Sequence, residues 1–476
     1  MTGLKQQFDC VVLGSGPGGY PAAIKAAQQG LSVALIEVGD LGGTCLNRGC
    51  IPSKALIAAA RAYNAIQHAE KLGITVQKVS FDYSKMVDRA QSVVTTIRKS
   101  LTGLLKANGI AILRGCGKFI SPSEIKVMGD DNAIVEGKSI IIATGSEPRV
   151  IPAFPCDQQR IHDSTSLLQM KTLPKKLVVI GGGVIGCEFA SMYNLLGVDV
   201  EIVEMLPRIL STECEELSDI LTKSLTDRGV AIHVNAFVEG VEKSPKGITV
   251  RLKGGKTLKG DMALVSVGRK VNTDAIGLEA AGLKVNENGS LSVDSRMRTS
   301  VEGIYAIGDV TAKWWLAHVA THNGLVAASQ VAGVPLLMHE NAVPSVVFTD
   351  PEIASVGMTA QQAEESGYTV RVGRYPFKAL GKSLATGHAE GFAQVVSDAG
   401  TGQILGAQIA GHEAATLIAE MALAVANELT LDCVVDTIHA HPTTPEAWME
   451  AALLARGTPI HFPPKRKREA HVSRAV

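Results

Sequence analysis

The chain has 476 residues, of which 46% are hydrophobic and 19% charged, a composition that indicates a globular protein of about three domains and excludes a disordered or fibrous one. Its 46 basic and 46 acidic side chains give a net charge of +0, so no overall field attracts nucleic acid or an anionic membrane surface. No apolar run reaches the roughly 18 residues of a spanning helix, and the chain start lacks the apolar centre of a signal or transit peptide. We expect a cytoplasmic protein of bacterial type, with no membrane insertion and no nucleic-acid partner.

Residues 8–37 are predicted to form a strand, a glycine-rich turn, a helix and a second strand. Gly14, Gly16 and Gly19 follow the first apolar run, and the second apolar run ends at Glu37. In such a unit the first glycine permits a tight turn, the second lets the backbone approach a pyrophosphate, and the third lets helix and strand pack closely. The helix N-terminus then faces phosphate, and the terminal carboxylate accepts the hydroxyls of an adenosine ribose.

The next stretch, GGTCLNRGCIPSK at residues 42–54, contains Cys45 and Cys50, separated by four residues. The 8 cysteines of the chain are scattered, which favours a reducing compartment, where a close pair is catalytic or metal-binding rather than structural. Zinc needs about four ligands, and no second pair or nearby histidine completes a site, so we expect no metal. A helix beginning near Pro52 would direct its positive dipole end toward the sulfurs and lower a thiol pKa. The pattern favours a redox pair.

A long helix is expected within residues 80–110, and strands within residues 110–121, 124–129 and 138–149, the last turning at Gly145. Several proline residues follow, a pattern that is typical of a connection between two domains.

The plan of the first unit returns at residues 175–204. Gly181, Gly183 and Gly186 precede Glu204, and the acid follows the first glycine by 23 residues in both copies (37 − 14 and 204 − 181). Two copies imply two dinucleotides, a pairing that indicates electron exchange. A carboxylate at Glu204 favours a free 2′-hydroxyl and thus NAD over NADP, although Arg208 leaves a phosphate-tolerant pocket open.

The remaining chain is predicted to contain an apolar strand within 261–270 and a short strand that delivers Asp309 at its end. From about residue 343, alternating strands and two helix-like segments, 414–429 and 431–439, indicate an α+β block. The final 14 residues, 463–476, are basic and are interpreted as a solvated tail.

Five separated motifs resemble those of the pyridine nucleotide–disulfide oxidoreductases, in the family order and over residues 7–460. They are the cysteine stretch, the paired glycine units, ATGS at 143–146, GIYAIGDV at 303–310 and HAHPTTPEAW at 439–448. The resemblance implies an α/β fold with two Rossmann-like dinucleotide-binding domains, for FAD and NAD, and a C-terminal α+β dimerisation domain. The implied boundaries are 1–149 and 273–342 for the two parts of the FAD-binding domain, 150–272 for the NAD-binding domain, and 343–476 for the interface domain with its basic tail.

The same resemblance assigns roles to single residues. Cys45 is the interchange thiol and Cys50 the flavin-facing thiol of a redox-active disulfide, while His441 is a base oriented by Glu446. The FAD-binding residues implied are Gly14, Gly16, Gly19, Glu37, Lys54, Thr144, Gly145, Asp309, Leu316, Ala317 and His318. The NAD-binding residues implied are Gly181, Gly183, Gly186, Glu188, Glu204 and Gly268. Glu188 is also expected to pair with Lys54, and no metal is expected.

Within the family, the chain resembles most the members that oxidise protein-bound dihydrolipoyl groups to lipoyl groups and reduce NAD⁺ to NADH. Such a flavoprotein is the shared dehydrogenase component of 2-oxoacid dehydrogenase or glycine cleavage complexes. The implied partners are a second copy of the chain, forming a homodimer, and the lipoyl domains and subunit-binding domain of those complexes. One alternative is an NAD(P)H-dependent reductase of another disulfide such as glutathione, which Glu204 disfavours. The other is a non-enzymatic flavoprotein, which the intact cysteine pair and the intact His441 and Glu446 disfavour.

Overall fold

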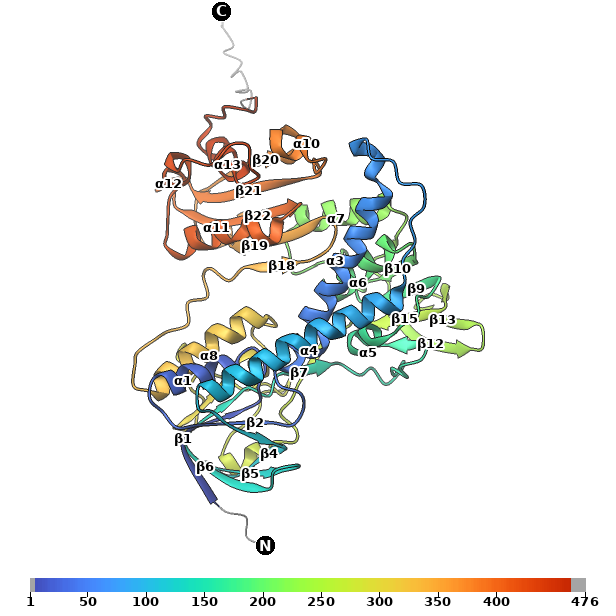
Figure 1. Ribbon diagram of the computed structural model, residues 1–476. Helices are drawn as coiled ribbons and strands as arrows, with labels where there is room; N and C mark the ends of the chain where they lie inside the picture. The colour runs from blue at the N-terminus through green and yellow to red at the C-terminus, as the bar shows by residue number, and fades with distance from the viewer. Residues whose placement is uncertain (1–4, 464–476) are drawn as a thin grey trace, which may run out of the picture. The chain divides into compact units, whose positions relative to one another are not determined.

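A computed structural model describes residues 5–463 and arranges them in two compact units (Figure 1). The first unit lies within Met1–His68, Val76–Pro207 and Val230–His339. The second lies within Ala69–Thr75, Arg208–Gly229 and Glu340–Val476. Apart from Pro463, the predicted basic tail lies outside the described residues. None of the helices in residues 5–463 is both long enough and apolar enough to cross a membrane.

A seven-stranded sheet forms the first part of the first unit. Its strand order is β3-β2-β1-β6-β5-β4, with β17 added beside β6. The central strands pair in parallel, whereas β4, β5 and β6 form an antiparallel meander. All five residues of β2 are buried, as expected for a strand covered on both faces. The bounds are β1 (Lys5–Leu13), β2 (Val33–Glu37), β3 (Ala111–Arg114), β4 (Cys116–Ser121), β5 (Glu124–Met128), β6 (Ala133–Ile142) and β17 (Ile304–Ala306).

Five α-helices accompany this sheet, and α1 and α8 lie side by side (Figure 1). The long helix expected within residues 80–110 is α4, whose N-terminus is capped by Asp82, because that side chain accepts the Lys85 N–H at 3.2 Å. The bounds are α1 (Gly19–Gln28), α2 (Gly43–Arg48), α3 (Cys50–Gln67), α4 (Tyr83–Ala107) and α8 (Ala317–Val331), with 3₁₀ turns η2 (Leu278–Ala281) and η3 (Gly308–Thr311).

The second dinucleotide unit predicted from the sequence is a five-stranded parallel sheet in the order β11-β10-β9-β15-β8. Its elements are β8 (Ile161–His162), α5 (Ser164–Gln169), β9 (Lys176–Ile180), α6 (Val184–Leu195), β10 (Asp199–Val203), β11 (Ala231–His233) and β15 (Met262–Val265). Two antiparallel sheets are separate from it. The first, which the sequence did not predict, consists of β12 (Val238–Ser244), β13 (Gly247–Leu252) and β14 (Thr257–Gly260), and the second pairs β7 (Ser146–Pro148) with β16 (Arg269–Val271). The predicted α/β class is confirmed.

The second unit contains an antiparallel sheet in the order β18-β19-β22-β21-β20. Helix α11 packs on β19 and β22, while α13 packs on β20 and β21 around the fully buried Trp448. The strands are β18 (Ser345–Val347), β19 (Glu352–Gly357), β20 (Val370–Pro376), β21 (Gly391–Asp398) and β22 (Ile404–Gly411). The helices are η1 (Ala69–Leu72), α7 (Glu215–Asp227), α9 (Ala360–Glu365), η4 (Phe377–Ala379), α10 (Gly381–Ala385), α11 (Ala414–Ala426), α12 (Leu431–Asp436) and α13 (Glu446–Arg456). The sequence predicted α11 and α12 but not α13.

Candidate active site and dinucleotide-binding turns

The turn between β1 and α1 has three glycines in three different environments. Gly14 has a φ of +104°, and a Cβ there would lie 2.4 Å from the Ala143 carbonyl oxygen. A Cβ on Gly19 would lie 1.8 Å from the Gly14 carbonyl oxygen, whereas a Cβ on Gly16 would meet nothing within 4 Å. The outer two glycines are therefore required by backbone packing, and Gly16 leaves the turn open to a ligand. This is the arrangement that a pyrophosphate needs.

The turn between β9 and α6 repeats this geometry. Gly181 also has a φ of +104°, and its Cβ would lie 2.5 Å from the Ser266 carbonyl oxygen. A Cβ on Gly186 would lie 1.9 Å from the Gly181 carbonyl oxygen, and one on Gly183 would meet nothing within 4 Å. The two turns thus offer two similar cradles, each at the N-terminus of a helix, where unpaired N–H groups favour anions.

Glu37 and Glu204 hold equivalent positions at the ends of β2 and β10. Glu37 accepts N–H groups from Ser15 and Gly39, both at 2.8 Å, and the Ser15 hydroxyl at 2.6 Å. Glu204 accepts N–H groups from Gly182 at 2.7 Å and from Leu206 at 2.8 Å. Since a carboxylate offers about four acceptor positions, each retains capacity for a ribose hydroxyl.

The residues after β6 lie next to the first turn. Thr144 follows Ala143, whose carbonyl oxygen closes against Gly14, and its hydroxyl is buried with no hydrogen-bond partner in residues 5–463. Buried polar groups normally have a partner, so an orphaned hydroxyl at this position fits a bound ligand. Gly145, with a φ of +70°, turns the chain away from the sheet, as predicted.

Asp309 belongs to a polar cluster that the sequence did not reveal. It accepts the Ser146 hydroxyl, and that hydroxyl oxygen accepts Arg269 Nε at 2.7 Å. Arg269 Nε also lies 3.8 Å from the Asp309 carboxylate. Burial raises the pKa of Asp309, opposed by Ser146 and Arg269. Gly268, beside Arg269, has a φ of +112° and open space at its Cβ position.

Helix α8 packs directly onto the first turn. Leu316 is its N-cap residue, and Ala317 and His318 open the helix. Thr321 donates its hydroxyl to the Pro17 carbonyl at 2.9 Å, and a Cβ on Gly324 would lie 2.3 Å from the Gly18 carbonyl oxygen. The predicted FAD-binding segments after β6, at the first turn and at the start of α8 therefore meet in one region.

The two cysteines lie in two consecutive helices. Cys45 is in α2, and Cys50 is the first residue of α3, so the helix begins two residues before Pro52, where it was predicted to start. Both are free thiols close enough to hydrogen-bond. The hydrogen bond from Cys45 is the largest cause that lowers the pKa of Cys50, to about 7; burial opposes it, and the charge of Lys54 lowers the pKa further. The same interaction with the Cys50 sulfur raises the pKa of Cys45. Cys50 is therefore the thiolate of the pair near neutral pH.

Lys54 forms the ion pair with Glu188 that the resemblance implied. Lys54 Nζ lies 2.9 Å and 2.8 Å from the two carboxylate oxygens of Glu188. Because α3 carries both Cys50 and Lys54, and Glu188 belongs to α6, the pair joins the cysteine helix to the helix of the second dinucleotide turn.

In the second unit, His441 and Glu446 form an imidazole–carboxylate pair, with Nδ1 and Oε1 2.8 Å apart. Glu446 also accepts the Thr443 N–H at 2.8 Å. Burial opposes ionisation of Glu446, but the Thr443 N–H and His441 outweigh it and lower its pKa. The His441 side chain is 78% exposed, so its other ring nitrogen is accessible to a reacting group. A fixed Nδ1 and an accessible Nε2 are what a general base requires.

His439 also contacts a glutamate carboxylate but, unlike His441, is almost completely buried. Its side chain is 5% exposed, and its two ring nitrogens contact the Glu420 carboxylate at 3.0 Å and the Thr437 carbonyl at 2.9 Å. This environment favours a structural role for His439. The part of the chain that the structure describes contains no group of three or more His, Cys, Asp or Glu side chains arranged for a metal.

Comparison with known proteins agrees with this geometry. Residues 8–324 match the pyridine nucleotide–disulphide oxidoreductase family, and residues 343–452 match the dimerisation domain of that family. The chain belongs to the pyridine nucleotide–disulfide oxidoreductases, as its motifs indicated, and is a flavoprotein oxidoreductase that uses FAD and NAD(H) and forms a homodimer.

The chain is similar to proteins called dihydrolipoyl dehydrogenase. It is 49% identical to that of Chlamydia pneumoniae over 462 residues, covering 97% of this chain and 100% of the relative. It is 44% identical to that of Geobacillus stearothermophilus over 460 residues, covering 96% and 98% of the two chains. Among solved structures, LpdA of Mycobacterium tuberculosis superposes with a TM-score of 0.89 at 29% identity, covering 94% of this chain and 99% of that one.

Proposed function

We propose that this enzyme oxidises protein-bound dihydrolipoyl groups to lipoyl groups and reduces NAD⁺ to NADH. The observation that carries the proposal is the sulfur pair, in which Cys50 has a pKa of about 7 beside Cys45 and Lys54. The relatives called dihydrolipoyl dehydrogenase support the substrate, because they match nearly the whole chain. Glu204 supports NAD over NADP, because its carboxylate would repel a 2′-phosphate.

The proposed chemistry starts from the oxidised, disulfide form of Cys45 and Cys50. A substrate thiolate attacks the Cys45 sulfur, which forms a mixed disulfide and releases Cys50 as a thiolate. The second substrate sulfur then attacks the first, so the cyclic disulfide leaves and Cys45 becomes a thiolate. His441 accepts the proton that the substrate thiol loses, and Glu446 holds the imidazole in place. Held at the first glycine turn, FAD would supply the two-electron chemistry that links the sulfur pair to NAD⁺.

We propose that residues of the two glycine turns, with the acid that follows each, bind the two dinucleotides. In the proposal, Gly14, Gly16 and Gly19 cradle the FAD pyrophosphate and Glu37 binds its ribose, with the orphaned Thr144 hydroxyl as one further contact. The turn at Gly181, Gly183 and Gly186, together with Glu204, does the same for NAD. The domain boundaries predicted above at residues 149, 272 and 342 belong to this proposal.

The partners and location that we propose follow from the substrate. A dihydrolipoyl group is carried on the lipoyl domains of 2-oxoacid dehydrogenase complexes, so we propose these domains and the subunit-binding domain as partners. We propose a cytoplasmic location for the same reason, since those complexes act on cytoplasmic 2-oxoacids in bacteria.

One assay tests the substrate and the coenzyme together. The purified FAD-loaded protein is given dihydrolipoamide with NAD⁺ or NADP⁺, and separately oxidised glutathione with NADH or NADPH. We expect turnover with dihydrolipoamide and NAD⁺ only. A Cys50→Ser variant should retain bound FAD and lose this turnover, because no disulfide can form. Preferred reduction of glutathione, or full activity of the serine variant, would contradict the proposal.

A further inference from the structure

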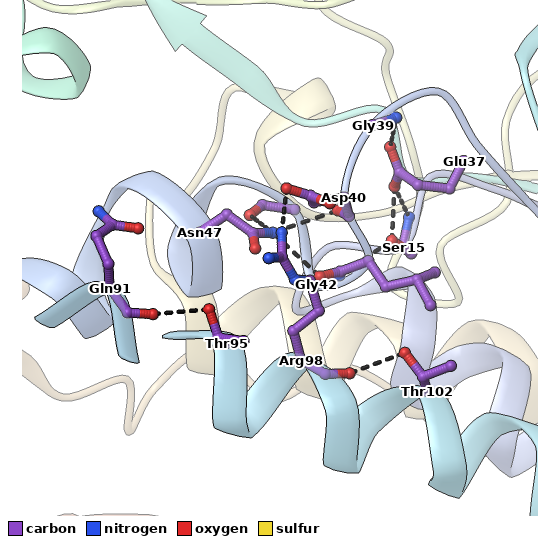
Figure 2. A network of polar contacts seen from close by, with 12 residues as sticks. Ser15, Glu37, Gly39, Asp40, Gly42, Asn47, Gln91, Thr95, Arg98 and Thr102 are labelled. Atoms are coloured by element: carbon purple, nitrogen blue, oxygen red, sulfur yellow. Dashed lines mark hydrogen bonds and ion pairs between the residues drawn. The ribbon is translucent and has the colours of Figure 1, made fainter. Parts of the chain in front are cut away.

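A four-residue segment, Gly39–Gly42, connects the carboxylate of Glu37 to α2, the helix that carries Cys45; we call it the strap (Figure 2). The Gly39 N–H donates to Glu37 at 2.8 Å, and the Gly39 carbonyl accepts Arg114 Nη1 at 2.7 Å. Asp40 forms an ion pair with Arg98 of α4. Leu41 is fully buried. Every residue of the strap before Gly42 is thus fixed by contacts with neighbouring elements.

Ser15 contacts both Glu37, which precedes the strap, and Gly42, the last residue of the strap. Its hydroxyl donates to Glu37 Oε2 at 2.6 Å and accepts the Gly42 N–H at 3.1 Å, and Figure 2 shows it between these two residues. The Ser15 side chain is completely buried, so water cannot replace it in either bond. One hydroxyl therefore contacts both the proposed ribose carboxylate and the N-cap residue of α2.

The cysteine helix itself depends on this connection. It has six residues and no side-chain cap at its N-terminus. Asn47 ties the helix to the strap, because its amide nitrogen lies 2.9 Å from the Gly43 carbonyl and 3.0 Å from the Leu41 carbonyl. A Cβ on Gly43 would lie 2.6 Å from the Gly16 Cα, so α2 begins in contact with the first glycine turn. A shift of the strap would move Cys45.

The second dinucleotide unit serves as an internal comparison. Gly182 there corresponds to Ser15, and its N–H donates to Glu204 at 2.7 Å as the Ser15 N–H does to Glu37. Gly182 has no side chain, and no cysteine helix follows Glu204. In the second unit the carboxylate of Glu204 is held by backbone N–H groups without any hydroxyl, so the hydroxyl of Ser15 is not needed for that purpose alone.

We propose, on the basis of the function proposed above, that Ser15 is a positioning residue that couples the ribose-binding carboxylate of Glu37 to the geometry of the Cys45–Cys50 pair through the strap. Loss of its hydroxyl affects two properties of the same enzyme. The Glu37 carboxylate loses a charge-assisted hydrogen bond, and the Gly42 N–H loses one of its two acceptors, the other being the Ser15 carbonyl at 3.2 Å.

The test uses the full-length, FAD-loaded enzyme with Ser15→Ala, which removes one oxygen, and Ser15→Gly, which reproduces the second unit. The matched control is Ser32→Ala: the Ser32 hydroxyl also donates to a carboxylate, that of Asp9, at 2.6 Å in the same sheet, but does not touch the strap. Two readouts are flavin release on dilution, followed by fluorescence, and the pH dependence of thiol alkylation by iodoacetamide after reduction.

We expect both Ser15 variants to release FAD about tenfold faster. We also expect the midpoint of their alkylation profiles to move to higher pH, because Cys45 then donates less well to the Cys50 sulfur. The Ser32 variant should match the wild type in both readouts. Faster flavin release with an unchanged alkylation midpoint would overturn the coupling, as would equal effects of Ser15→Ala and Ser32→Ala. Absence of dihydrolipoamide turnover in the wild type would contradict the proposed function and leave this test intact.

Discussion

Two neighbours lower the pKa of Cys50 and so set the reactivity of its sulfur: the neutral thiol of Cys45 and the charged amine of Lys54. The hydrogen bond from Cys45 contributes most to the lowered pKa of about 7, and the charge of Lys54 contributes further, whereas burial and the Glu188 carboxylate oppose both. Above about pH 7 the reduced enzyme therefore carries a thiolate at Cys50, and below it a thiol. A thiol at its ordinary pKa of about 8.5 would remain protonated at neutral pH.

Replacing Lys54 by methionine should therefore raise the pKa of Cys50. The cation is lost, and the negative charge of Glu188, no longer offset by Lys54, acts in the same direction. We expect the midpoint of iodoacetamide alkylation of the reduced enzyme to move up by roughly one pH unit. Lys106→Met, a surface change on α4, is the matched control and should leave the profile unchanged. A wild-type midpoint in the Lys54 variant would show that the ion pair does not govern the thiolate.

Single residues also mark where prediction from sequence was incomplete. The glycines and the two acids could be predicted, because their spacing repeats within the chain. The contacts of Ser15, Asn47 and Arg98 could not, because each depends on a residue far along the chain or on a side-chain conformation. The sequence contained one indication that Ser15 is unusual: it stands at the position where the second copy of the motif has a glycine, Gly182.

The two strand–turn–helix elements explain why glycine stands at each motif position, and for different reasons. At Gly186 an added Cβ would collide with the backbone of Gly181, whereas at Gly183 it would enter open space. Gly183 has a φ of −75° and a ψ of −173°, which any residue can adopt. Of these two glycines, Gly186 is therefore required for folding, and Gly183 is required for the ligand.

This difference predicts opposite outcomes for two alanine variants. Gly186→Ala should destabilise the protein by about 1–3 kcal/mol, because turn and helix must move apart. Gly183→Ala should keep the wild-type unfolding midpoint but bind NAD⁺ roughly tenfold more weakly, since its methyl group stands where the pyrophosphate approaches. Denaturant unfolding and NAD⁺ titration measure the two effects. Gly103→Ala, an exposed helical position with open space, controls for the added methyl group and should not weaken NAD⁺ binding. Equal losses of stability in the two motif variants would contradict the assignment.

Elements with strong periodicity were predicted well, and those held by tertiary contacts were not. The first strands, α4, α11 and the C-terminal strands β21 and β22 have clear apolar patterns in the chain. The antiparallel strands β12, β13 and β14 alternate charged and apolar residues in short runs, and they are stable because they pair with one another. Helix α13 follows two prolines, which read as loop, but Trp448 in its first turn is fully buried and donates to the Leu417 carbonyl at 3.1 Å.

At the scale of the whole molecule, the proposed catalytic groups belong to two units of the chain. The sulfur pair lies in the first unit, and the His441–Glu446 pair lies in the second, within the part that matches the family's dimerisation domain. The exposed imidazole is thus carried by the segment that defines the homodimer. We propose that this histidine serves the sulfur pair of the partner subunit, which would make dimer formation inseparable from catalysis.

Mixed dimers test that arrangement directly. A dimer of one Cys50→Ser subunit and one His441→Gln subunit, isolated with two affinity tags, should recover about half of wild-type activity if the base acts across the dimer, because one of its two sites is then complete. Both parent homodimers should be inactive. The control is a dimer of a wild-type subunit with a subunit carrying both substitutions: acting across the dimer, each site lacks one group, and activity should be lost. If the base serves its own subunit, the two mixed dimers exchange outcomes, since the double variant leaves the wild-type site whole. Dihydrolipoamide-dependent NADH formation, normalised to bound flavin, distinguishes the two cases.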